Sequence, residues 1–415
     1  MRRLPAYPLF LFLSGSHAFL FTMMSFIHAI YRVEAAHLNP LQLVLLGTAL
    51  EVVIFIFEVP TGLVADVYSR RLSVIIGYAV VGLAFVLQGS LPFFLPILLG
   101  EMLWGLGWTF ISGAEDAWLA DEIGEERLGR AYLRASQAGR IGALMGILVS
   151  SALGTRGLAL PILISGAAYF VPAFFLGLFM PETGFRPTPR GARSSWSQMA
   201  ATFRDGLRLV LGSRVLMLIL VIGLFFGLSS EGLDRLWHAH LLAHFTFPDI
   251  GRLQGPVPWF GALGAASLVL GLIVTETIQR RIDVENTGRA LRAQFALNLV
   301  MVVSVVVFGV ATRLPVALLA ILAVQVFRGA NGPLYRAWIN KQIEPRVRAT
   351  VLSMNGQVDA IGQVLGGPGM GWLATAYSTR ATMVAVAILL SPVLLLYLLA
   401  MQWRIHGVVQ AEAAA

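Results

Sequence analysis

The chain alternates long apolar runs with short polar links along its whole length. An α-helix needs roughly 20 apolar residues to cross the hydrocarbon core of a bilayer. Twelve runs approach that length: 8–30, 41–61, 73–91, 95–116, 136–154, 160–181, 215–241, 256–278, 291–312, 315–337, 351–376 and 381–403. Because a helix satisfies its own backbone hydrogen bonds in lipid, we predict twelve transmembrane helices in an all-α integral membrane protein.

The composition agrees with a membrane protein. Of the 415 residues, 57% are hydrophobic and 13% are charged, whereas soluble domains are about 45–50% apolar and about 25% charged. The first run, from about Tyr7 to Tyr31, is too long for the apolar part of a signal peptide, so we expect an uncleaved first span. The chain has no cysteine, which excludes disulfides and cysteine-ligated metals. We predict neither a metal nor another cofactor.

Basic residues are concentrated in alternate links, as Arg70 and Arg71 illustrate after the second run. Basic residues favour the cytoplasmic side of a membrane, so we predict that both termini are cytoplasmic. The formal net charge of +8 therefore reflects topology, and no nucleic-acid partner is expected. Lys341 is the only lysine among 30 basic residues, which favours a GC-rich bacterial genome and hence a multi-pass protein of a bacterial inner (plasma) membrane.

The longest link divides the chain into two halves. We predict an N-terminal six-helix bundle over residues 1–181, a cytoplasmic linker over residues 182–214 and a C-terminal six-helix bundle over residues 215–415. The linker is rich in proline and arginine at first and then predicts an amphipathic helix from Trp196 to Leu211. Such a helix either lies on the inner membrane surface or is a soluble connection.

Two motifs recur in the two halves. The segment Gln137-x-x-x-Ile141-Gly142-x-x-x-Gly146 is followed 220 residues later by Gln357-x-x-x-Ile361-Gly362-x-x-x-Gly366, and Gly113-Ala114 is followed 216 residues later by Gly329-Ala330. Together with six runs on each side of the linker, these pairs favour an internal duplication. Gly-x-x-x-Gly spacing also lets helices approach closely, so we expect a packing role as well.

The link after the second run carries a motif, Glu58-Val-Pro-Thr-Gly-Leu-Val-Ala-Asp-Val-Tyr-Ser-Arg-Arg71. It resembles the loop between helices 2 and 3 of major facilitator superfamily (MFS) transporters, whose pattern is Gly-x-Leu-Ala-Asp-Arg-x-Gly-Arg-Lys/Arg. The matching residues are Gly62, Ala65, Asp66, Arg70 and Arg71, and the departures are Val64, Val67 and Ser69. Without the resemblance, the link is an ordinary basic turn.

The resemblance implies two pseudo-symmetric six-helix bundles, with a central cavity lined by helices 1, 4, 7 and 10. It also implies a gating role for Gly62, Asp66, Arg70 and Arg71, with Asp66 near the start of the eleventh span at residues 348–350. A helix N-terminus attracts a carboxylate, which supports that placement. The acidic inner end of the fourth span (Glu115, Asp116, Asp121 and Glu122) is expected to meet basic residues such as Arg70.

Polar side chains recur at helical spacing inside several runs, although a charge near the middle of a bilayer is costly. The candidates for proton coupling are Glu231, Asp234, Arg235, Glu101, Glu51 and Asp359. The candidates for lining a substrate cavity are His17, Trp104, Trp108, His238, Arg328, Asn331, Tyr335 and Gln363. The alternatives are structural: a static ion pair with Arg235, structural partners for Glu101 and Arg328, and packing roles for the histidines and tryptophans.

The chain departs from the drug/proton antiporters that it otherwise resembles. They carry an arginine in the fourth span, four residues before a glycine, where this chain has Glu101 before Gly105. Their Gly-Pro pair in the fifth span is absent, and Gly367-Pro368 stands in the eleventh span instead. The segment Pro181-Glu-Thr-Gly resembles a sugar-porter motif, but that motif follows the last span, so we set it aside.

These features predict a secondary transporter, closest to bacterial drug-efflux-type members of the superfamily. We expect it to export small amphipathic molecules in exchange for protons by alternating access, as a monomer in the lipid bilayer. The alternatives are an uptake symporter or uniporter of a small metabolite and, less favoured, a non-transporting sensor. The sequence contains no phosphate-binding Gly-x-x-x-x-Gly-Lys-Ser/Thr segment and no HExxH metal motif, so we predict neither ATP-driven transport nor an enzyme.

Overall fold

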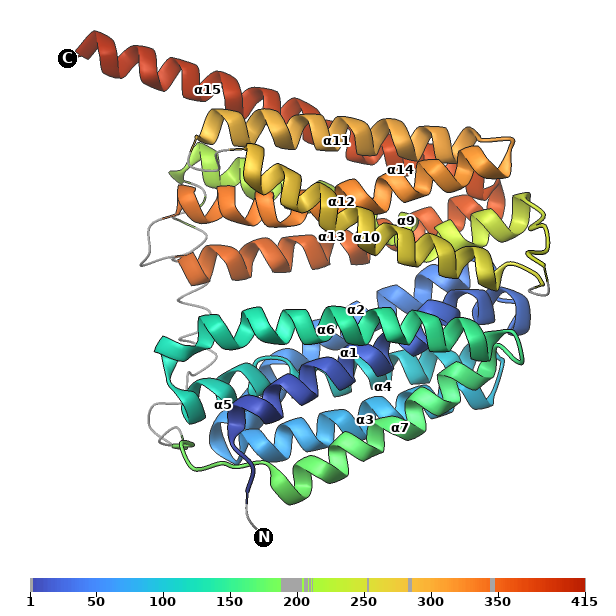
Figure 1. Ribbon diagram of the computed structural model, residues 1–415. Coiled ribbons are helices and arrows are strands. Elements are labelled where there is room, and N and C mark those ends of the chain that lie inside the picture. Colours follow the sequence, from blue (N-terminus) through green and yellow to red (C-terminus); the bar gives the residue numbers. More distant parts are fainter. Residues whose placement is uncertain are drawn as a thin grey trace. The chain divides into compact units, whose positions relative to one another are not determined.

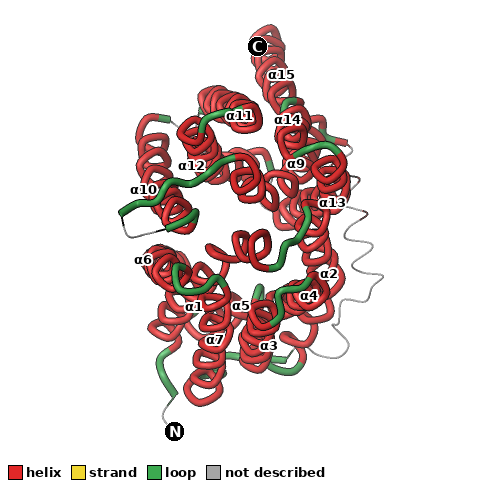
Figure 2. The backbone as a smooth tube through the Cα atoms, turned by 90° about the vertical axis from the view of Figure 1, so that its right-hand side faces the viewer, coloured by secondary structure: helices red, strands yellow, loops and turns green. Residues whose placement is uncertain are grey.

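The computed structural model describes residues 3–187, 204, 208, 210, 212–251, 254–282, 286–343 and 348–414. These residues form helices joined by short loops, with no β-strand among them (Figure 2). Most of the predicted amphipathic helix from Trp196 to Leu211 lies outside the described residues. The chain divides into two compact units, each of which is described by itself. Unit 1 comprises Met1–Arg193 and Phe247–Gly264, and unit 2 comprises Ser194–Thr246 and Ala265–Ala415.

The helices of each unit follow the chain in order (Figure 1). Unit 1 contains α1 (Ala6–Ile30), its π-helical continuation η1 (Tyr31–Ala35), α2 (Pro40–Val67), α3 (Arg70–Ser90), α4 (Phe94–Ile111), α5 (Ala114–Ile123), α6 (Glu125–Gly154) and α7 (Ala159–Phe179). Unit 2 contains α9 (Arg214–His244), α11 (Thr287–Val310), α12 (Leu314–Gln342), α13 (Arg348–Ala376), α14 (Thr379–Leu390) and α15 (Pro392–Ala414). Helix α10 (Val257–Arg281) includes residues of both units.

Short polar side chains mark where several helices begin. Asn39 and Gln42 form a capping box at the start of α2, with Asn39 Oδ1 2.9 Å from the Gln42 amide nitrogen. Ser69 Oγ accepts a hydrogen bond from the Leu72 amide at the start of α3, at 2.9 Å. Ser378 caps α14 in the same way. These side chains satisfy backbone N–H groups that the first helical turn leaves open, so the links define the helix starts.

Ten helical segments are long and apolar enough to cross a membrane, counted over the described part of the chain. They are Ala6–Ala35, Pro40–Val67, Arg70–Ser90, Phe94–Ile123, Ala159–Phe179, Arg214–His244, Val257–Ile278, Thr287–Val310, Leu314–Lys341 and Thr379–Trp403. Helices α6 and α13 coincide with the predicted fifth and eleventh spans, but polar residues dilute their apolar content. The count of twelve and the cytoplasmic termini therefore stay predictions.

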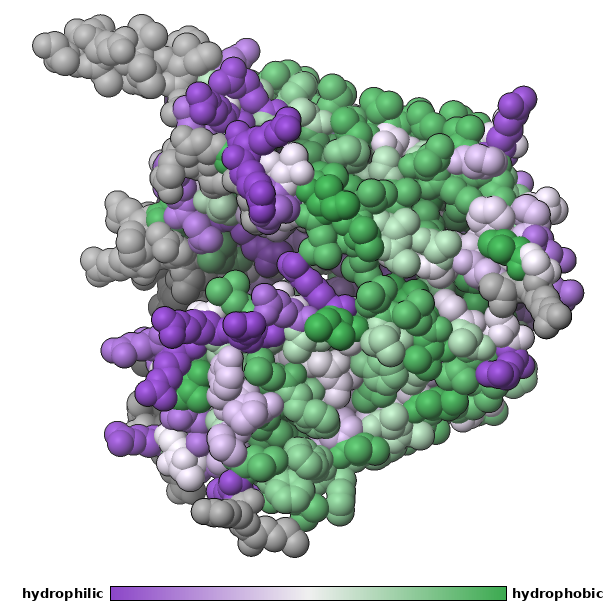
Figure 3. All heavy atoms as spheres, viewed as in Figure 1, coloured by the Kyte–Doolittle hydropathy of each residue, from purple (hydrophilic) through white to green (hydrophobic). Residues whose placement is uncertain are grey.

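The surface suits a lipid environment. On the face shown in Figure 3, apolar side chains cover the middle of the helices in each unit, and charged side chains gather near helix ends. Large apolar side chains such as Phe174, Leu133 and Leu365 are mostly exposed. In water such exposure would be unfavourable, whereas lipid tails solvate these side chains.

Glycines set the closest helix contacts in both units. In unit 1, a Cβ atom at Gly146 of α6 would lie 2.6 Å from the carbonyl oxygen of Phe19 in α1. In unit 2, a Cβ atom at Gly362 of α13 would lie 2.6 Å from the carbonyl oxygen of Leu224 in α9. Real Cβ atoms do not come that close, so each repeated Gly-x-x-x-Gly motif holds its helix against an equivalent partner. The expected packing role is therefore present in both copies.

Candidate functional site

Unit 2 contains a cavity of about 410 Å³, which we call the unit 2 cavity. Helices α9, α11, α12, α13 and α14 line it. Its lining residues are Phe226, Ser229, Ser230, Leu233, Asp234, Met301, Arg328, Asn331, Gly332, Tyr335, Arg336, Asp359, Gln363, Val386 and Leu390. The sequence analysis singled out six of these as candidates: Asp234, Arg328, Asn331, Tyr335, Asp359 and Gln363. Three different helices bring them to one cavity, although they lie far apart in the chain.

An ion pair between α9 and α12 occupies this cavity wall. Both guanidinium nitrogens of Arg328 donate to the Asp234 carboxylate, with Nη2 2.9 Å from Oδ2 and Nη1 in a shorter contact with Oδ1. The two side chains are about 42% and 44% exposed, so they face open space. A two-pronged contact of this kind fixes orientation as well as charge.

A second carboxyl group faces the same cavity from α13. Asp359 Oδ2 accepts a hydrogen bond from Gln363 Nε2, one helical turn later, at 2.8 Å. Asp359 has no ion-pair partner in the part of the chain that the structure describes, but its charge acts on Arg328. The unit 2 cavity thus contains one arginine with two carboxyl groups within its electrostatic reach.

Polar groups around this pair are held in place by hydrogen bonds. The Tyr335 hydroxyl donates to the carbonyl oxygen of Ile219 at 3.0 Å and lies 3.3 Å from Asn355 Oδ1. Asn331 is buried, and its Oδ1 accepts from Asn298 Nδ2 at 3.2 Å. Buried polar groups keep their positions when such partners are present, so the cavity wall is preorganised.

Glu231 and Arg235 lie on α9 but do not line the unit 2 cavity. Glu231 is buried, and its Oε2 accepts from Arg235 Nε at 3.2 Å. The geometry is that of the static ion pair considered from the sequence. His238, one turn further on, also lies outside the cavity lining, and its ring is tilted by 35° against that of Trp237, with ring centres 3.4 Å apart.

Unit 1 contains a cavity of about 430 Å³, which we call the unit 1 cavity. It lies where the fourth predicted span is interrupted. Helix α4 ends at Ile111, Ser112 is extended, and Gly113 has a φ of 65° before α5 begins. The lining residues are Phe10, Ser14, His17, Trp108, Ile111, Ser112, Gly113, Glu115, Asp116, Tyr132, Ala135 and Ser136. A positive φ suits glycine, so the break has a local cause in Gly113.

Aromatic rings surround His17 at this cavity. Trp108 lies 5.7 Å from His17 between ring centres, and Tyr169 Oη is 3.3 Å from His17 Nδ1. Trp108 also lines the cavity. Trp104 does not line it, because its ring packs against Phe21 and Phe85 at 5.5 and 6.0 Å. Of the two tryptophans, Trp108 is thus placed to contact a ligand and Trp104 to pack.

Glu101 belongs to a separate, fully buried cluster. Its carboxylate forms an ion pair with Arg32 of η1, and His28 Nδ1 lies 4.0 Å from Glu101 Oε1. Arg32 Nη2 also donates to Gln88 Oε1 at 3.4 Å. The structural partner considered for Glu101 is therefore Arg32. Glu51 is partly buried in α2 and lines neither cavity.

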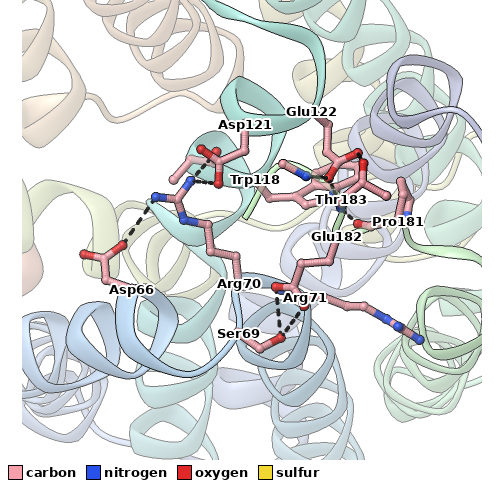
Figure 4. A network of polar contacts seen from close by, with 12 residues as sticks. Asp66, Ser69, Arg70, Arg71, Trp118, Asp121, Glu122, Pro181, Glu182 and Thr183 are labelled. Carbon is pink, nitrogen blue, oxygen red and sulfur yellow. Dashed lines mark hydrogen bonds and ion pairs between the residues drawn. The ribbon is translucent and has the colours of Figure 1, made fainter. Parts of the chain in front are cut away.

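The loop between α2 and α3 packs against two other segments of unit 1 (Figure 4). Arg70 forms an ion pair with Asp121 of α5, and its Nη2 lies 3.6 Å from Asp66 Oδ1. We expected Arg70 to contact the acidic inner end of the fourth span, and Asp121 makes this contact. Gly62 has open space around its Cα. The side chains of residues 348–350, expected near Asp66, lie outside the described part of the chain.

The segment Pro181-Glu-Thr-Gly, which the sequence analysis set aside, closes this network (Figure 4). Glu182 accepts hydrogen bonds from the Ser69 hydroxyl at 2.9 Å and from the Arg71 amide at 3.0 Å. Glu122 Oε2 accepts from the Thr183 hydroxyl at 2.8 Å. Glu182 thereby supports the start of α3, a role whose signal was the acidic residue directly after the sixth span.

The break between α4 and α5 is a feature of the unit 1 cavity that the sequence analysis did not predict. Glu115 and Asp116, which were expected to meet basic residues such as Arg70, line this cavity. The break was missed because the fourth span was predicted as one continuous run over residues 95–116. The signal that would have found it is the Ser-Gly pair followed by two acidic residues in the first turn of the next helix.

Comparisons with known proteins match this chain to transporters. The family model described as Major Facilitator Superfamily matches residues 9–367. The chain is 23% identical over 357 residues to the "Uncharacterized MFS-type transporter YxaM" of Bacillus subtilis (strain 168), covering 86% of each chain.

Solved structures of transporters resemble the fold. A variant of the nucleoside transporter NupG gives a TM-score of 0.76 at 12% identity, covering 95% of this chain and 99% of that one. A bacterial homologue of the human lysosomal transporter Spinster gives 0.74 at 16% identity, covering 96% and 97%. A POT family transporter in complex with 5-aminolevulinic acid gives 0.69 at 12% identity, covering 95% of each chain.

Proposed function

This chain belongs to the Major Facilitator Superfamily, and on that premise we propose that it exports small amphipathic molecules in exchange for protons by alternating access. Membership of a transporter family makes it a multi-pass membrane transporter rather than an enzyme. Its substrate is accordingly a small molecule. Direction and proton coupling are our proposal.

The proposal includes the finer arrangement expected from the sequence. Helices α6 and α13 serve as the fifth and eleventh of twelve spans, and the two six-helix bundles cover residues 1–181 and 215–415. Both termini and the linker over residues 182–214 are cytoplasmic, and the protein works as a monomer in a bacterial inner membrane. The alternation of basic links and the repeated Gly-x-x-x-Gly contacts support this arrangement.

The observation that carries proton coupling is the arrangement of Arg328, Asp234 and Asp359 in the unit 2 cavity. When Asp234 takes up a proton, it loses its charge and no longer holds the guanidinium of Arg328. A cationic side chain that loses its counter-charge is attracted to the next carboxylate within reach, so Arg328 then turns toward Asp359 or toward substrate. Protonation and the position of Arg328 are thereby linked, which is what proton exchange requires.

This geometry ranks the carboxyl candidates. Asp234 and Asp359 face the cavity, where a proton can arrive and leave, whereas Glu231 is buried against Arg235 outside it. We therefore assign proton transfer to Asp234 and Asp359 and a positioning role to Glu231. Asp66 and Arg70, together with Gly62 and Arg71, act in gating at the loop, where Arg70 already connects α3 with α5.

The test uses everted membrane vesicles with an acidified interior. Adding lipophilic cations or antibiotics should dissipate the pH gradient with the wild type, and Asp359→Asn should abolish that dissipation at equal expression. The control is Glu276→Gln, which removes an exposed carboxylate paired with Arg280 on α10. If Asp359→Asn keeps full dissipation while Glu231→Gln loses it, the assignment of the two sites is reversed.

A second candidate is an uptake symporter or uniporter of a small polar metabolite. The hydroxyl and amide groups of Ser229, Ser230 and Asn331 in the unit 2 cavity favour it, because such groups recognise polar substrates. The similar solved structures named as a nucleoside transporter and as a peptide transporter point the same way. If no compound dissipates the gradient, uptake of radiolabelled nucleosides and small peptides into right-side-out vesicles distinguishes this candidate.

A further inference from the structure

We infer that the unit 1 cavity is a binding site for an organic cation, with Glu115 as its charged partner and the rings of Trp108 and Tyr132 as its walls. The inference rests on the proposed transport function and names the substrate class more narrowly. It concerns a cavity within unit 1, separate from the carboxyl groups to which we assigned proton transfer.

The charge of the cavity lining is the first argument. Among the described residues that line it, Glu115 and Asp116 are acidic, and neither lysine nor arginine is present. Asp116 is exposed to solvent, whereas Glu115 is partly buried. Glu115 has no hydrogen-bond or ion-pair partner in the described part of the chain. A partly buried carboxylate without a partner has lost some of its hydration, so it gains by pairing with an incoming cation.

The walls of the cavity are the second argument. Trp108 comes from the last turn of α4, and Tyr132 comes from α6, where it contacts Phe10 of α1 edge-to-face at 5.9 Å between ring centres. Aromatic faces attract cations through their quadrupole, most strongly in sites withdrawn from water. A cavity of about 430 Å³ also accommodates a ligand of drug-like size rather than a metal ion.

The break between α4 and α5 is the third argument. The extended Ser112 and the positive φ of Gly113 turn the chain so that the first turn of α5 presents Glu115 to the cavity. In an uninterrupted helix, Glu115 would lie at a different angle around the helix axis. Interrupted transmembrane helices recur at the binding sites of transporters because they bring polar groups to mid-membrane cavities.

Proton and cation compete for Glu115 if this inference holds. The titratable groups facing it are Asp116 on its own helix, His17 of α1, Tyr78 of α3 and Tyr132 of α6. A cation pairs only with the ionised carboxylate, so cation binding should weaken as the pH falls. Glu115→Gln has no proton to exchange there and should lose that pH dependence.

The experiment measures binding to purified full-length protein in detergent micelles, without any gradient. Tritiated tetraphenylphosphonium is the probe, and tetraphenylborate, which has the same shape and the opposite charge, is measured in separate samples; empty micelles are subtracted. We expect the wild type to bind the cation and not the anion. Glu115→Gln should weaken cation binding about tenfold, since a charge-assisted contact is lost. Trp108→Ala should weaken it by a similar factor.

The matched control is Glu125→Gln, which removes an exposed carboxylate at the start of α6, outside the cavity. It should bind the cation like the wild type. If Glu115→Gln is poorly folded by size-exclusion chromatography, Glu115→Asp keeps the charge and should keep cation binding with its pH dependence. Equal binding by wild type and Glu115→Gln overturns the inference, as does equal binding of the borate.

The outcome also separates this inference from the proposed function. Asp359→Asn should bind tetraphenylphosphonium normally and fail only in gradient dissipation, since Asp359 lies in unit 2. Binding that depends on Glu115, together with no dissipation by any compound, supports the cation site and rejects proton exchange. Dissipation that persists in Glu115→Gln with unchanged cation binding rejects the site and keeps the exchange.

Discussion

The two cavities have similar volumes, but charged side chains form an ion pair in one cavity, whereas the described lining of the other contains no ion pair. In the unit 2 cavity, Arg328 is held by Asp234 and lies within the electrostatic reach of Asp359, so charges of both signs are present. In the unit 1 cavity, Glu115 has no partner among the described residues, and the described lining includes neither lysine nor arginine. A site whose charges are paired is stable without a ligand, whereas an unpaired charge is stabilised when a ligand of opposite charge binds. From this comparison we infer that unit 2 takes part in proton transfer and unit 1 binds the substrate.

The largest expected effect comes from breaking the paired site. Arg328→Ala leaves Asp234 without its partner and should reduce transport by about 100-fold, within the range of coupling free energies of close charge pairs. Gradient dissipation in vesicles at matched expression measures this loss. The double variant Arg328→Ala/Asp234→Ala should recover thermal stability but not transport. Transport near the wild-type rate in Arg328→Ala would remove the proton-handling role from unit 2.

A smaller effect separates paired from unpaired carboxyl groups within unit 1. Glu101→Gln leaves Arg32 buried without its counter-charge and should destabilise unit 1 by about 3–5 kcal/mol. Glu115→Gln removes a charge that has no partner among the described residues and should leave stability unchanged or raise it. Thermal unfolding of both variants in the same detergent tests the contrast. Equal destabilisation by the two would show that Glu115 has a structural partner after all.

The smallest expected effect distinguishes the two tryptophans of α4. Trp104→Phe keeps an aromatic ring against Phe21 and Phe85, so it should change stability by about 1 kcal/mol or less and leave tetraphenylphosphonium binding unchanged. Trp108→Phe should weaken cation binding severalfold, because phenylalanine offers a weaker face for a cation. Equal effects on binding would mean that Trp108 also only packs.

Much of the fold could be predicted because composition decides it. Long apolar runs must become helices in lipid, and caps such as Asn39 and Ser69 define where they begin. The family followed from the loop around Asp66 and is now shown over most of the chain. The contact of Asp121 with Arg70 was foreseeable because the short link keeps both at the same end of unit 1.

The site was harder to predict, because helical spacing gives a stripe of residues but not the direction in which the stripe points. Glu231 and Asp234 are nearly adjacent on α9, yet only Asp234 faces the unit 2 cavity. The rotation of α9 is set by close contacts such as that of Leu224 with Gly362, which no single helix reveals. The turn at Gly113 was missed for a related reason, because apolar periodicity does not register it and the fourth span was predicted to continue to residue 116.

The glycine contacts of α6 and α13 also bear on how the chain is assembled in the membrane. Both helices are the more polar members of their units and gain little by entering lipid alone. Each packs against a more apolar helix made earlier during synthesis, α1 for α6 and α9 for α13, through carbonyl contacts that only glycine permits. We expect each polar helix to pack against that partner as it leaves the translocation machinery. A bulky residue at Gly146 or Gly362 would then act during biogenesis, before any substrate is bound.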